Sequence, residues 1–308
     1  WKRELLLASG AVCAVLTASL ALLGRGDLAL ASGLYVVAAV ACGLGENFLG
    51  SFLPQLSTPR TVGRVSAFGW TMSYVGALAL LGIVAAWTML LGRDEPSEAR
   101  PVFVFAGLWF AIGIVPSFIW LREKPVPGGG LAAPATGSGS LLLSTGARLL
   151  RTAREARRFR QFARFMGIFF VYSMGTQSVI YFLGMLGNDM GFKLPQLILF
   201  ALVMSIAAGL AAFATSRFQD RIGHTRTISL FLGVWVVGVG VLCAAQLVSL
   251  PHWLFWGVSG LLGLGLGGIG TSSRAIVGAF TPLDRAAEFF GLWGMVYKLS
   301  GVCGVVLF

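Results

Sequence analysis

Three ionisable residues stand inside long apolar runs of this sequence: Glu46, Arg274 and Lys298. A charged side chain at membrane depth costs about 2.5–3.5 kcal/mol on insertion scales, so such residues mark solute pathways or ion pairs. Lys298 stands ten residues into its run and is the first candidate for binding a substrate or coupling to a proton. The alternative is a lysine that is neutral, snorkels to the surface or bonds a carbonyl.

Glu46 and Arg274 lie near the ends of their apolar runs, at comparable places in two similar parts of the chain. Two interpretations remain open for them. They could pair and close a gate between the two parts, or each could reach the lipid headgroups. Asn47, next to Glu46, is a further candidate for contact with a substrate.

Uncharged polar residues gather in the apolar run 165–187. Thr176, Gln177 and Tyr181 could share one face of a helix there and present hydrogen-bonding groups to a cavity. Hydrogen bonds between neighbouring helices are the alternative.

The sequence has no pattern typical of a metal site, a cofactor site or a catalytic site. The four cysteines lie in apolar runs without a CxxC pair, and the two histidines fall in short loops. The glycine-rich run 257–270 lies within an apolar segment and lacks the Lys-Ser/Thr of a phosphate-binding loop. We therefore expect no metal, no cofactor and no enzymatic activity, and we interpret the glycines as sites of close helix packing.

The composition identifies the elements that carry these residues. Of 308 residues, 56% are apolar and only 11% are charged, whereas soluble domains have about 25% charged residues. This excludes a soluble enzyme, a disulfide-rich secreted scaffold and a disordered tail, and predicts an all-α membrane protein. About 20 apolar residues cross a bilayer as a helix. Nine stretches meet that length: 5–24, 28–49, 67–91, 102–121, 165–187, 194–213, 227–249, 253–273 and 289–308.

Basic residues predict the orientation. With residue 1 in the cytoplasm, the inner segments hold 17 Lys and Arg and the outer segments hold 4. This is a strong positive-inside signal, and it explains the net charge of +11 without nucleic acid. The loops expected in the cytoplasm are 50–66, 122–164, 214–226 and 281–288.

The longest of these loops, 122–164, divides the chain into an N-terminal bundle, 1–121, and a C-terminal bundle, 165–308. It begins as a linker rich in Gly, Pro and Ser and continues as a basic helix over 149–160. We expect that helix to lie on anionic lipid headgroups.

The two sides of the linker resemble each other. Thr58-Pro59 precedes Phe68-Gly69 as Thr281-Pro282 precedes Phe290-Gly291, at an offset of 222–223 residues. Both copies have the same orientation in the membrane. Parallel repeats of this kind are typical of transporters in which two helix bundles rock around a central cavity.

A short charged motif, D-R-x-G-x-x-R, lies in the loop 214–226. It comprises Asp220, Arg221, Gly223 and Arg226. Gly223 permits a tight turn, and Asp220 could face the N-terminus of a helix or an arginine of a neighbouring helix. The motif could act as a gate that opens and closes, or as a static clip between two helices.

The chain resembles the major facilitator superfamily, and within it the bacterial members of the vacuolar amino-acid effluxer-like branch. The D-R-x-G-x-x-R loop motif is typical of the superfamily. Two further stretches resemble the branch. The first comprises Glu46-Asn47-Phe48, Phe52-Leu53-Pro54-Gln55-Leu56, Gly63-Arg64-Val65-Ser66 and Gly69-Trp70. The second comprises Ala287-Glu288-Phe289-Phe290-Gly291-Leu292 and Lys298-Leu299-Ser300.

This resemblance implies a secondary transporter of a small solute, with amino acids as the suggested class and a proton or cation as the coupling ion. A lipid or lysolipid transporter on the same scaffold is the alternative. The nine stretches would correspond to helices three to eleven of twelve, so we expect a fragment that lacks the first two helices and the last. The implied location is a bacterial plasma membrane.

Overall fold

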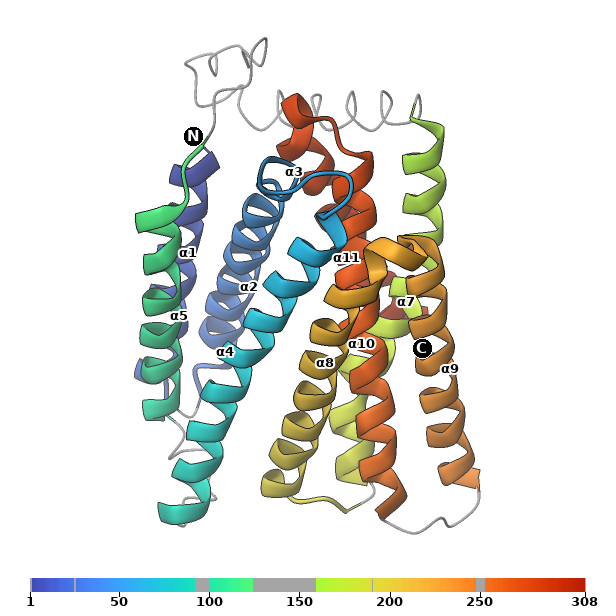
Figure 1. The fold of residues 1–308 in the computed structure, drawn as a ribbon. Coiled ribbons are helices and arrows are strands. Elements are labelled where there is room, and N and C mark those ends of the chain that lie inside the picture. Colours follow the sequence, from blue (N-terminus) through green and yellow to red (C-terminus); the bar gives the residue numbers. More distant parts are fainter. Residues whose placement is uncertain are drawn as a thin grey trace.

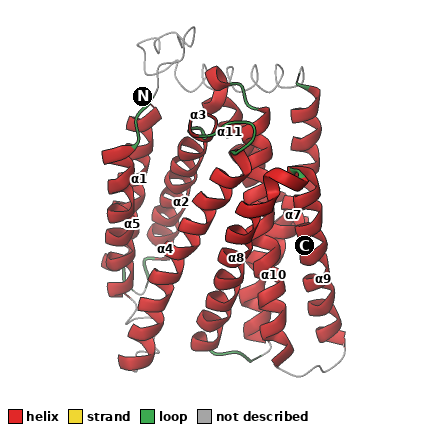
Figure 2. Ribbon diagram, in the orientation of Figure 1, coloured by secondary structure: helices red, strands yellow, loops and turns green. Residues whose placement is uncertain are grey.

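The computed structural model describes residues 2–24, 26–91, 100–123, 159–189, 191–247 and 253–307. Within these ranges every regular element is helical, and no strand is present (Figure 2). In the described part of the chain, nine helical segments are long and apolar enough to span a bilayer, as the sequence predicted. The helices are α1 (Lys2–Ser19), α2 (Leu28–Gly50), α3 (Leu53–Leu56), α4 (Val62–Leu91), α5 (Arg100–Trp120), α7 (Arg160–Asp189), α8 (Leu194–Ile222), α9 (His224–Leu247), α10 (Trp253–Phe280) and α11 (Ala286–Leu307), with short 3₁₀ turns at Leu20–Leu22 and Leu283–Arg285.

Several helices are longer than the apolar stretches that predicted them. The range 214–226 was expected to be a loop, but α8 continues through it to Ile222 and only Gly223 separates it from α9. Apolar length marks only the part of a helix that suits hydrocarbon, and charged residues extend the same helix into the aqueous layer. Gly223 makes the turn with φ = 93°, in the left-handed region that favours glycine.

The helices form two groups that lie side by side (Figure 1). α1 packs against α2 and α5 in the first group, while α10 packs against α8 and α9, and α11 against α7, in the second. α4 of the first group packs against α8 of the second and joins the two groups. The division at 121 and 165 stays a prediction, and the predicted basic helix at 149–160 lies outside the described residues.

Glycines bring α10 close to α8. A Cβ at Gly263 would overlap the Met204 carbonyl oxygen, and one at Gly267 would overlap the Ala208 carbonyl oxygen. The two glycines stand four residues apart and so lie on one face of α10. Close packing between helices is the role that the sequence predicted for this glycine-rich run.

Replacing Gly267 with alanine is expected to destabilise the protein by about 1–3 kcal/mol, because the new methyl group meets backbone that cannot move aside. Gly260→Ala on the same helix is the matched control, since a Cβ at Gly260 meets nothing within 4 Å. Thermal unfolding in detergent, followed by size-exclusion chromatography, measures both variants. Equal melting temperatures for the two would contradict this account of the α8–α10 contact.

Candidate functional site

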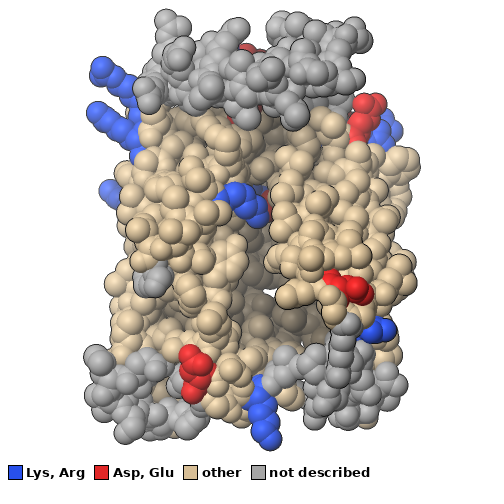
Figure 3. Space-filling model, turned by 180° about the vertical axis from the view of Figure 1, so that it is seen from behind, with Lys and Arg blue, Asp and Glu red and all other residues tan. Residues whose placement is uncertain are grey.

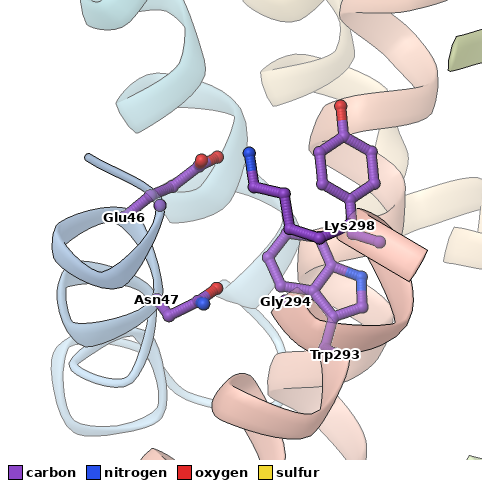
Figure 4. A pocket seen from close by; sticks show the side chains of 7 residues that line it. Glu46, Asn47, Trp293, Gly294 and Lys298 are labelled. Carbon is purple, nitrogen blue, oxygen red and sulfur yellow. The ribbon is translucent and has the colours of Figure 1, made fainter. Parts of the chain in front are cut away.

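A small pocket lies between α2 of the first group and α11 of the second (Figure 4). It brings together residues separated by about 250 positions in the sequence. The lining residues are Gly43, Glu46 and Asn47 from α2 and Trp293, Gly294, Tyr297 and Lys298 from α11. Three of the predicted site residues, Glu46, Asn47 and Lys298, therefore meet in one place.

Two glycines allow this close approach. A Cβ at Gly43 would stand 3.1 Å from Cε of Lys298, so Gly43 leaves room for the lysine stem to lie over α2. A Cβ at Gly294 would overlap the Asn47 amide, so this glycine admits Asn47 to the surface of α11. Each helix thus accepts a polar side chain of the other.

The charged ends of Glu46 and Lys298 extend into the same space (Figure 4). In the described part of the chain, no ion pair within 4.0 Å joins them, and no carbonyl bonds the lysine. The ammonium of Lys298 lies 5.8 Å from the ring centre of Tyr297. From the opposite side the surface is hollowed between the two helix groups, and basic and acidic side chains are visible in its upper part (Figure 3). Glu46 and Lys298 are both exposed, so both charges are available to a third group.

Arg274 joins α10 to α4 beside this pocket. Its Nη2 donates to the Ser66 carbonyl oxygen at 3.0 Å, its Nε donates to the Ser66 hydroxyl at 3.3 Å, and its guanidinium lies 5.9 Å from the Trp70 ring centre. Ser66 in turn donates to the Thr271 carbonyl oxygen at 2.9 Å. Arg274 thus turns inward to α4 rather than out to the headgroups, and Glu46 is the carboxylate within its electrostatic range.

The three polar residues of α7 do not share one face. Gln177 accepts a hydrogen bond from the Tyr297 hydroxyl at 3.0 Å, and both Gln177 and Tyr181 lie against Gly301 of α11. Thr176 instead donates to the Ser173 carbonyl oxygen of its own helix at 3.2 Å. Residues four apart are neighbours on a helix surface, whereas adjacent residues diverge by about 100°. Gln177 therefore acts on the pocket through Tyr297.

The Gln177–Tyr297 bond gives a direct test. Gln177→Leu leaves the tyrosine hydroxyl without its acceptor and is expected to destabilise the protein by about 1–3 kcal/mol. Adding Tyr297→Phe removes the unsatisfied hydroxyl and is expected to restore most of that loss. The melting temperatures of the two single variants and the double variant measure the coupling. A double variant that melts at the sum of the two single effects would show that this bond contributes nothing.

The charged motif joins the same two groups at the end of the helices near α3. Asp220 of α8 accepts hydrogen bonds from the backbone N–H groups of Gly63 and Arg64, both at 2.9 Å. These are donors of the first turn of α4, which have no partner within their own helix. Asp220 thus caps a helix of the other group, and its negative charge interacts favourably with the N-terminus of that helix. Arg221 and Arg226 are exposed.

The sequence did not single out Ser66, Trp293 and Tyr297 as candidate residues. Ser66 occurs in one of the compared stretches, and Trp293 directly follows another, but neither residue type stands out there. Tyr297 could have been found from the sequence, because a tyrosine next to a lysine in an apolar helix marks a polar point on an otherwise apolar face. Among the described residues, no group of three His, Cys, Asp or Glu side chains is placed to hold a metal ion.

The sequence is similar to those of known proteins. The family model for the vacuole effluxer Atg22-like proteins matches residues 1–308. Autophagy-related protein 22-1 of Penicillium rubens is 26% identical over 257 residues, which are 78% of this chain and 43% of that protein. The MFS-type transporter YxiO of Bacillus subtilis is 21% identical over 285 residues, 89% of this chain and 62% of that protein. The chain thus spans less than two thirds of these relatives.

A solved structure shows the same fold. The crystal structure of the human organic anion transporter MFSD10 superposes with a TM-score of 0.76 at 17% identity, covering 99% of this chain and 70% of that one. At this identity the likeness concerns the fold alone.

Proposed function

The chain belongs to the vacuole effluxer Atg22-like family within the major facilitator superfamily, and we propose that it moves a small solute across the membrane by alternating access, without ATP. It is a multi-pass membrane protein, and its relatives are transporters rather than enzymes. Amino acids are the solute class that the family resemblance suggests. The observation that carries the proposal is the pocket between the two helix groups, where Glu46 and Lys298 face a common space.

Two sets of contacts would form the gate. Asp220 ties α8 to α4, and Arg274 ties α10 to α4, so both link one helix group to the other. When the groups rock apart at this end, these bonds must break, and the pocket lies in the same interface between the groups. Lys298 would bind the solute, and Glu46 would take up the coupling proton or cation.

For the setting of the protein we propose a bacterial plasma membrane. The excess of basic residues supports a cytoplasmic location for 50–66, 122–164, 214–226 and 281–288. The basic segment 149–160 would bind anionic lipids there.

Counterflow into proteoliposomes tests the transport function. The full-length protein is reconstituted, and radiolabelled amino acids are offered with and without a proton gradient. Saturable uptake that the gradient accelerates is the expected result. Uptake of lysolipid alone would favour the lipid transporter, and no movement of any solute under any gradient would overturn the proposal.

A further inference from the structure

We propose that the transported solute carries a net charge of −1 and that its carboxylate binds Lys298. This rests on the proposed transport function and narrows the solute class. The evidence for this proposal is the balance of charge and of hydrogen-bonding groups around the α2–α11 pocket.

The charges at membrane depth do not cancel. Away from the helix ends, the described residues near the pocket place two cations, Arg274 and Lys298, around one carboxylate, Glu46. An uncompensated charge at this depth is unfavourable. Before Glu46 takes up its coupling ion, a monoanion makes the group neutral, whereas a neutral zwitterion leaves one positive charge in excess.

Two buried polar groups at or near the pocket also have no hydrogen-bond partner among the described residues. The indole N–H of Trp293, a pocket residue that is 5% exposed, has no partner among the described residues, and neither does the hydroxyl of Tyr74, which is 9% exposed. Tyr74 lies within electrostatic range of Glu46 and Tyr297, and the Trp293 indole lies beside the Lys298 side chain (Figure 4). Buried polar groups are normally paired. A carboxylate, which only accepts hydrogen bonds and has about four acceptor positions, can pair with donors of this kind.

Arg274 explains why Lys298 is the free cation. The guanidinium of Arg274 is already bonded to the Ser66 hydroxyl and carbonyl, and a Cβ at Gly69 would lie 2.5 Å from its Nη2. Lys298 has no such acceptor among the described residues. An acidic amino acid and a simple monocarboxylate both satisfy this chemistry.

Thermal-shift titration of the full-length protein in nanodiscs tests the charge of the solute, with pairs of ligands that differ in charge but have nearly the same shape. Glutamate is compared with glutamine, and lactate with lactamide. We expect the anion of at least one pair to bind about 10- to 100-fold more tightly than its amide, as a charge-assisted hydrogen bond implies. A response to glutamate but not to lactate identifies an acidic amino acid as the solute. A response to both anions identifies a broader monocarboxylate site.

Lys298→Met is expected to abolish this preference, and Lys193→Met, in an exposed loop of the same chain, is expected to keep it. An amide that binds as tightly as its anion in both pairs, or no shift with either anion, would overturn the inference, even if Lys298→Met does not fold. The two proposals fail separately. Counterflow of neutral amino acids without charge preference would refute the monoanion and leave transport standing, while selective anion binding without counterflow would do the reverse.

Discussion

Lys298→Ala is expected to reduce solute counterflow to below about one tenth of that of the unchanged protein. The side chain is the one pocket cation that the described residues leave without a hydrogen-bond acceptor, so the solute supplies its partner. Losing a charge-assisted bond of this kind corresponds to about a 10- to 100-fold change in binding. Initial rates in proteoliposomes over a range of solute concentrations measure it.

The controls for this variant separate charge from folding. Lys193→Ala removes a lysine from an exposed loop and should leave the rate unchanged. Lys298→Arg keeps the charge but replaces a compact ammonium with a planar fork, so a partial rate is expected. Transport by Lys298→Ala at the full rate would remove this lysine from the mechanism.

The sequence predicted the membrane helices and the rare charges because both depend on local composition. Nine spans follow from apolar length, and Lys298 stands out because lysine is costly at that depth. The partners could not be predicted in the same way. That Glu46 meets Lys298, and that Arg274 bonds Ser66, depends on how α2, α4, α10 and α11 pack, which no local pattern encodes.

The Asp220 motif lies between these cases. Its residue types left two partners open for Asp220, a helix N-terminus or an arginine of a neighbouring helix, and the structure places Asp220 at the first turn of α4. The helix that receives it could not be identified, because α4 and α8 are more than a hundred residues apart in sequence. The contact is a gate if its energy differs between the two states, and a static clip if its energy is the same in both.

Asp220→Ala is expected to shift the protein away from the state in which α4 and α8 are closed together. The substitution removes two hydrogen bonds to the first turn of α4 and the favourable charge at that helix end. Together these contribute about 1–2 kcal/mol, which changes the ratio of closed to open molecules by roughly 5- to 30-fold. Spin labels at Arg60 and Thr225, two exposed positions, on a background without native cysteines, report the separation of the two groups by pulsed electron resonance.

The matched control is Asp284→Ala, which removes an exposed aspartate from the corresponding turn before α11. A gate predicts a longer mean distance in Asp220→Ala and no change in Asp284→Ala. Asp220→Asn keeps one carbonyl acceptor for the α4 backbone but loses the charge, so an intermediate distribution is expected from it. If all three variants give the same distances as the unchanged protein while Asp220→Ala lowers the melting temperature, the contact holds the helices in both states, and the motif is a static clip.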